Sequence, residues 1–147
     1  MNVEFQNDLY RLYYYDADKS IFVNEIYGRW TWEDAHTVVN HGNYFISSMS
    51  SPKYVISHFK DDGILLPVNT RYTLANLRRI MQLDQTDEDL VIFVGVSAFL
   101  KALINTISGI YGFFNQTARY RYARTFEDAL KMIEAHKVSH ANKAKLS

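Results

Sequence analysis

One long apolar segment limits most strongly how this chain can fold. Residues 91–114 include a single charged side chain, Lys101, and 24 residues are enough for a membrane-spanning helix. Gly95 and Ser97 divide the segment, however, into a short β-branched run and a longer part with helical spacing. We therefore expect a buried strand followed by an amphipathic helix, and no membrane span.

The helical part of this segment carries its polar residues on one stripe. Lys101, Asn105, Ser108 and Gly112 recur at spacings of four, three and four residues, which place them on one side of an α-helix. Such a stripe is typical of a helix with one face in water. Because the N-terminal residues also lack the basic and apolar regions of a secretory signal, we expect a cytoplasmic protein.

The composition narrows the chemistry that is open to the chain. Its 147 residues contain no cysteine, which excludes disulfides, thiolate catalysis and cysteine-based zinc sites. Sixteen basic side chains balance sixteen acidic ones, so the positive charge of a dedicated nucleic-acid binder is missing. We expect a single globular domain with no nucleic-acid partner.

Strands and helices are predicted to alternate along most of the chain. Two runs of aromatic and β-branched residues on either side of a polar turn predict a hairpin, and a helix capped by Thr31 follows it. Three strand–helix pairs come after that helix. The expected strands are 9–15, 21–27, 53–60, 91–94 and 119–123, and the expected helices are 31–49, 70–83, 97–114 and one capped by Thr125.

This order, β-β-α-β-α-β-α-β-α, predicts an α/β fold. We expect a mixed, mostly parallel sheet of about five strands flanked by about four helices. The core of the domain is expected at residues 9–137, followed by a basic tail, 138–147, that frays. Gly42 lies inside the first predicted helix and weakens the expectation that this helix is continuous.

The element order resembles that of the STAS domain, the fold of bacterial anti-sigma-factor antagonists and of the cytoplasmic tails of sulphate transporters. The similarity covers residues 9–137 and is carried by the stretches 21–34 and 89–97. Within that superfamily the chain is most similar to the SpoIIAA-like group. The resemblance implies a non-catalytic regulatory domain that interacts with a protein partner.

One stretch departs from the pattern of the phosphorylatable antagonists. Those proteins carry an Asp-Ser-Ser-Gly-type sequence at the start of the helix after the third strand. The corresponding region here, residues 61–70, is longer and has no Ser-Gly pair. Thr70 and Thr73 are the hydroxyl side chains near that helix start, so the phosphoserine switch of the family is in question.

The candidate partner-binding residues lie where the predicted strands end. In open α/β sheets, ligands bind at the carboxyl edge of the strands, and helix N-termini attract anions. For Asp61 and Asp62 the alternative is a solvated turn without a binding role. For Ser97 the alternative is a helix N-cap. The candidates for partner binding or phosphorylation are Asp61, Asp62, Asn69, Thr70, Thr73 and Ser97.

The five histidines do not predict a metal site. His36 and His41 are five residues apart and would point away from each other on a helix. His136 and His140 can share a helix face but lack a third ligand. His58 lies on a predicted strand, either as a satisfied core or edge histidine or as a pocket group. Since recognisable catalytic and phosphate-binding motifs are also missing, we expect no metal, no cofactor and no enzymatic activity.

Aromatic side chains are the most unusual feature of the composition. There are 22, half of them tyrosines, and such residues are typical both of partner surfaces and of the rim of a small core. Two alternatives to a regulatory protein partner follow. The first is a small-molecule or lipid pocket lined by the apolar helix 99–114. The second is self-association, for example as a homodimer, through exposed aromatics such as Tyr14 or Phe114.

Overall fold

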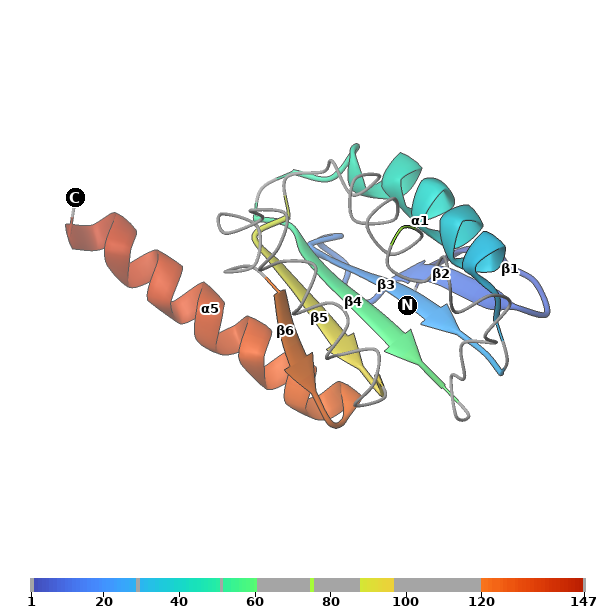
Figure 1. Ribbon diagram of the computed structural model, residues 1–147. Coiled ribbons are helices and arrows are strands. Elements are labelled where there is room, and N and C mark those ends of the chain that lie inside the picture. The colour runs from blue at the N-terminus through green and yellow to red at the C-terminus, as the bar shows by residue number, and fades with distance from the viewer. Residues whose placement is uncertain are drawn as a thin grey trace.

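Six strands form one sheet in which the strand order follows the sequence (Figure 1). The computed structural model describes residues 2–28, 30–50, 52–60, 75, 88–96 and 120–146. The strands are β1 (Asn2–Gln6), β2 (Tyr10–Tyr14), β3 (Ile21–Ile26), β4 (Tyr54–Phe59), β5 (Leu90–Val94) and β6 (Tyr120–Ala123). The helices with described bounds are α1 (Trp32–Ile46) and α5 (Phe126–Leu146).

The sheet is mixed and mostly parallel, as the sequence predicts. β1, β2 and β3 are antiparallel neighbours, while β3, β4, β5 and β6 run parallel to one another. All the strands expected from the sequence are present at nearly the expected bounds. The strand count is corrected from about five to six, because β1 was not predicted.

β1 was not predicted because its alternation of apolar and polar residues is weak and because the contacts that hold it are made with other elements of the fold. Its apolar side chains are Val3 and Phe5, and a bulge between them interrupts the alternation. The ring of Phe5 lies against Tyr10 of β2 and His41 of α1, with ring centroids 5.2 and 4.4 Å apart. Such packing decides whether a short edge segment forms a strand, and a five-residue pattern does not reveal it.

α1 begins at a capping box, which confirms the predicted cap. Oγ1 of Thr31 accepts a hydrogen bond from the N–H of Asp34 (3.1 Å), and the Asp34 carboxylate accepts one from the N–H of Thr31 (2.9 Å). The helix continues unbroken through Gly42. A Cβ at that position would lie 3.0 Å from the side-chain oxygen of Asn24 on β3, so the glycine lets the helix pass close to the sheet.

The two helices cover opposite faces of the sheet (Figure 1), and each face has its own apolar core. Side chains along a strand alternate between the faces, so each inner strand contributes to both cores. The core beneath α1 includes Leu12, Phe22, Val38 and Val55. The core beneath α5 includes Val23, Ile56, Ile92, Ala129 and Ile133.

The three consecutive tyrosines show the effect of this two-sided core. Tyr13 and Tyr14 are both buried, on opposite faces, while Tyr15 is 42% exposed. The prediction that Tyr14 is an exposed aromatic is therefore wrong, because its ring packs edge-on against Phe22 with centroids 5.2 Å apart. Phe114, the other aromatic named for self-association, lies outside the described residues.

α5 starts at the predicted cap and packs on the sheet through its first turns. The N–H of Asp128 donates to Oγ1 of Thr125 over 3.1 Å. Ala129 and Ile133 are fully buried, and the helix contacts β4, β5 and β6. Residues 138–143 are exposed, and the helix continues over the segment for which we expected a frayed tail.

Two of the four expected helices fall almost entirely outside the described residues. Of the predicted ranges 70–83 and 97–114, only Ala75 is described, and it is helical. The count of four helices therefore stays a prediction. In the part of the chain that the structure describes, no helix combines the length and the apolar character that crossing a bilayer requires.

Candidate functional site

The residues predicted to bind a partner lie outside the described part of the chain. They are Asp61, Asp62, Asn69, Thr70, Thr73 and Ser97. The helix 99–114, named for a small-molecule or lipid pocket, lies outside it as well. These assignments stay predictions. The ends of β3 and β4 are described, and they hold polar side chains that the sequence analysis did not bring together.

A charged cluster lies on the α5 face of the sheet, near the carboxyl ends of β3 and β4. Strand pairing places Arg11 of β2 opposite Glu25 of β3, and Glu25 beside His58 of β4. Tyr27 and Lys60 follow two residues after Glu25 and His58, so they project from the same face. We refer to these five residues as the charged cluster.

Glu25 is the centre of the charged cluster. Its side chain is only 3% exposed, and both carboxylate oxygens have partners. Oε1 accepts a hydrogen bond from the hydroxyl of Tyr27 (2.7 Å), and Nη2 of Arg11 lies 3.0 Å from Oε1 and 3.1 Å from Oε2. Nζ of Lys60 is 3.8 Å from Oε2. A buried carboxylate needs such partners because an unpaired charge inside a protein is strongly unfavourable.

These contacts decide the ionisation state of Glu25 and Tyr27. Burial acts to raise the pKa of Glu25, but hydrogen bonds from Tyr27 and Arg11 and the charges of Arg11 and Lys60 outweigh burial and hold this pKa below its usual value. Burial, together with the Glu25 carboxylate, raises the pKa of Tyr27 to about 12. At neutral pH Glu25 is therefore ionised and Tyr27 is protonated.

The cations of the charged cluster are nearer to the solvent than its carboxylate. The Arg11 guanidinium lies over the ring of Tyr13, 4.7 Å from the ring centroid, and the Arg11 side chain is 21% exposed. The Lys60 side chain is 43% exposed. With two cations around one carboxylate and a neutral His58, the charged cluster holds one excess positive charge.

His58 connects the charged cluster to the start of α5. Its ring stacks on Phe126, the first residue of that helix, with centroids 5.5 Å apart and planes at 26°. Its Nδ1 atom is buried and has no hydrogen-bond partner among the described residues. Burial lowers the pKa of His58; Glu25 opposes this effect and Lys60 adds to it. The imidazole is therefore neutral at pH 7.

The lowered pKa of His58 predicts a loss of stability in mild acid. Because of the lowered pKa, His58 binds a proton more readily in the unfolded chain than in the folded chain. The free energy of unfolding should therefore decrease as the pH falls below about 6.5, and this contribution should level off below the folded pKa. His58→Phe keeps the ring stack and should remove this part of the slope, measured by urea unfolding at several pH values.

The matched control for this measurement is His140→Gln, which replaces an exposed histidine. This variant should keep the slope of the wild-type protein. If the His58→Phe protein loses stability in acid as steeply as the wild type, the neutral state of His58 in the folded chain is contradicted.

Two other histidines are hydrogen-bonded within the chain. Nδ1 of His41 lies 3.0 Å from the hydroxyl of Tyr10, and Nδ1 of His136 lies 2.9 Å from the hydroxyl of Tyr54. His136 also stacks on His140, with ring centroids 6.2 Å apart. The described ranges contain no group of three or more side chains that could hold a metal ion.

Of the charged cluster, His58 is a candidate from the sequence alone, whereas Arg11, Glu25, Tyr27 and Lys60 were not predicted. A signal for Glu25 was available in the predicted strand 21–27, because alternation places its side chain on the same face as Ile21 and Val23. A carboxylate on an apolar face needs a cationic partner, and Arg11 is on the other strand of the same predicted hairpin.

Comparisons with known proteins return few matches. No protein-family model matches the chain, and no curated protein matches it. Among solved structures, the chain is similar to an anti-sigma-factor antagonist (STAS) domain protein from Planctomyces limnophilus, with a TM-score of 0.48 and 13% sequence identity. The match covers 84% of this chain and 97% of that chain.

Proposed function

We propose that this chain is a non-catalytic, STAS-like protein-interaction domain that binds a regulatory partner at the carboxyl edge of its parallel strands. The bonding of Glu25 carries this proposal. Its carboxylate is engaged by Arg11 and Tyr27 and stays ionised. A general acid or base needs a pKa near the working pH, whereas groups with fixed charge are suited to recognising a partner.

The partner is expected to meet positive charge at the charged cluster. Glu25 is buried, whereas Arg11 and Lys60 reach the surface. The buried carboxylate orients both cations and reduces the conformational freedom that they would otherwise lose on binding. Lys60 also directly precedes the predicted partner-binding segment 61–70 in the sequence.

Lys60→Glu tests this function, because it reverses the more exposed cation while Arg11 and Glu25 themselves are not replaced. Exposed charge pairs contribute about 0.2–1 kcal/mol each, so a reversal should weaken partner binding by about three- to tenfold. The measurement is quantitative mass spectrometry of proteins retained by the immobilised chain from a lysate of the source cells.

Lys131→Glu is the matched control for Lys60→Glu. It reverses an exposed lysine on α5, outside the charged cluster. A protein that is retained by the wild type and by Lys131→Glu, but is depleted with Lys60→Glu, supports the proposal. Equal retention by all three forms contradicts it, and a bound small molecule or lipid without a protein, seen by native mass spectrometry, would favour the pocket hypothesis instead.

A further inference from the structure

The charged side chains of the chain are distributed unevenly along its length. All sixteen acidic side chains precede His136, and the charged side chains after it are Lys137, Lys143 and Lys145. The residues before His136 therefore hold sixteen acidic but thirteen basic side chains, a net charge of −3. The end of α5 and the rest of the molecule carry opposite charge. We refer to residues 137–145 as the basic end.

The basic end extends beyond the sheet (Figure 1). His136 and Lys137 still contact Tyr54 of β4. Nδ1 of His136 meets the Tyr54 hydroxyl, and Nζ of Lys137 lies over the Tyr54 ring, 5.7 Å from its centroid. Residues 138–143 are all exposed, and Val138 retains 60% of its accessible surface. A helical segment this short is marginally stable in water without packing, so a second surface placed against it would stabilise it.

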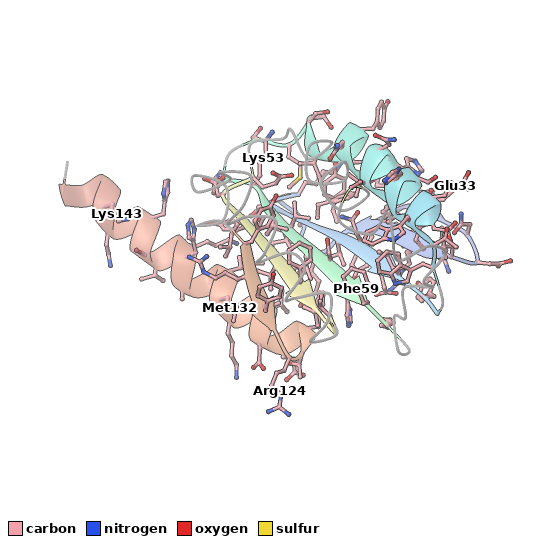
Figure 2. All side chains as sticks on the ribbon, in the orientation of Figure 1. Glu33, Lys53, Phe59, Arg124, Met132 and Lys143 are labelled. Atoms are coloured by element: carbon pink, nitrogen blue, oxygen red, sulfur yellow. The ribbon has the colours of Figure 1, made fainter. Side chains whose placement is uncertain are left out.

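The opposite end of the molecule presents acidic side chains. Glu4 of β1, Asp8 in the turn between β1 and β2, and Glu33 in the first turn of α1 are exposed. We refer to these three residues as the acidic pole. Figure 2 shows Glu33 and Lys143 at opposite ends of the molecule, and Figure 1 shows β1 on the same side as the start of α1.

We propose that this chain associates head to tail, with the basic end of one copy docked on the acidic pole of a second copy. Each copy carries both complementary surfaces at opposite ends, so the surfaces of one copy are poorly placed to meet each other. The interface joins two unlike surfaces and is therefore heterologous. Each dimer keeps one vacant basic end and one vacant acidic pole, and it adds further copies as the concentration rises.

Sedimentation velocity of the full chain, from about 10 μM to about 1 mM, measures this association, which is steered by charge and screened by salt. In about 50 mM NaCl the average mass should rise with concentration and continue past the dimer. In about 500 mM NaCl the apparent Kd should increase by at least about tenfold. A monomer at every concentration in low salt, or association that salt does not weaken, overturns the proposal.

Neutralising variants then test which surfaces meet. Lys143→Gln with Lys145→Gln removes charge from the basic end, and Glu4→Gln with Glu33→Gln removes it from the acidic pole. Each double variant alone should weaken self-association by about tenfold. An equimolar mixture should associate again but stop at the dimer, because each copy has lost one of its two surfaces.

The matched control is Arg124→Gln with Lys131→Gln, which removes two exposed positive charges from other parts of the molecule. This variant should associate as the wild type does. If two basic ends instead formed a symmetric dimer, the changes at Glu4 and Glu33 would not alter the strength of self-association. Unchanged association of the acidic-pole variant therefore overturns the head-to-tail arrangement.

Discussion

Gly95→Ala is expected to lower the free energy of unfolding by about 2–4 kcal/mol, since it combines a backbone penalty with a steric clash. Gly95 follows β5 with φ +79°, in the left-handed region that costs an alanine about 1–2 kcal/mol. A Cβ there would lie 2.4 Å from the carbonyl oxygen of Phe59, the last residue of β4. Because the obstacle is backbone, a change of side-chain rotamer cannot relieve the clash.

Gly28→Ala is the control that separates the two parts of this penalty. Gly28 also has a positive φ, +61°, but among the described residues a Cβ there would have nothing within 4 Å. The Gly28→Ala variant should therefore lose only the backbone part of the penalty, about 1–2 kcal/mol of the free energy of unfolding. Urea unfolding at a constant m-value measures both variants. Equal losses would contradict the close approach of the strand ends at Gly95.

Glu25→Ala is expected to cost about 2–3 kcal/mol of stability. Removing one partner of a fully buried ion pair costs about 3–5 kcal/mol, and Arg11 recovers part of this because its side chain is 21% exposed. The pKa of Glu25 is lowered in the folded chain. The stabilisation is therefore present above the unfolded pKa and is lost as the pH falls through the folded value. The variant should accordingly show a shallower loss of stability in acid.

Two companion variants check the origin of this effect. Glu134→Ala removes an exposed carboxylate, 3.6 Å from Lys137, and should change stability by less than about 1 kcal/mol. Arg11→Met combined with Glu25→Leu replaces the pair by apolar side chains and should recover most of the loss. If Glu25→Ala costs no more than Glu134→Ala, the buried pair does not contribute to stability as argued.

Much of the fold could be predicted from the sequence because its signals are local. Thr31 with Asp34, and Thr125 with acidic residues behind it, marked the starts of α1 and α5 before any contact was known. The strand runs were apolar enough to stand out. β1 could not be recognised in this way, since Phe5 is only partly buried and packs on residues of β2 and α1 that the fold brings to it.

The charged cluster depends on strand register, which a single sequence reveals only in part. Arg11 and Glu25 belong to one hairpin and could have been paired from the length of its turn. His58 lies beside Glu25 because β3 and β4 are parallel neighbours in the sheet. In the sequence these two strands are separated by the whole of α1. The sequence shows that Glu25 and His58 each lie on a predicted strand, but it does not show which strands are neighbours. The contact between these two residues therefore becomes visible only in the structure.

The two faces of the sheet are completed at different times during synthesis. α1 follows β3 directly, so the core beneath it can begin to form early. The face that holds Val23, Ile56 and Ile92 receives Ile133 only after β6 and the start of α5 have been made. At about 5–20 residues per second, Val23 precedes Ile133 by about 5–20 seconds on the ribosome. During that interval the nascent chain presents an apolar sheet face that chaperones can bind, and of the helices with described bounds α5 is the one that covers this face.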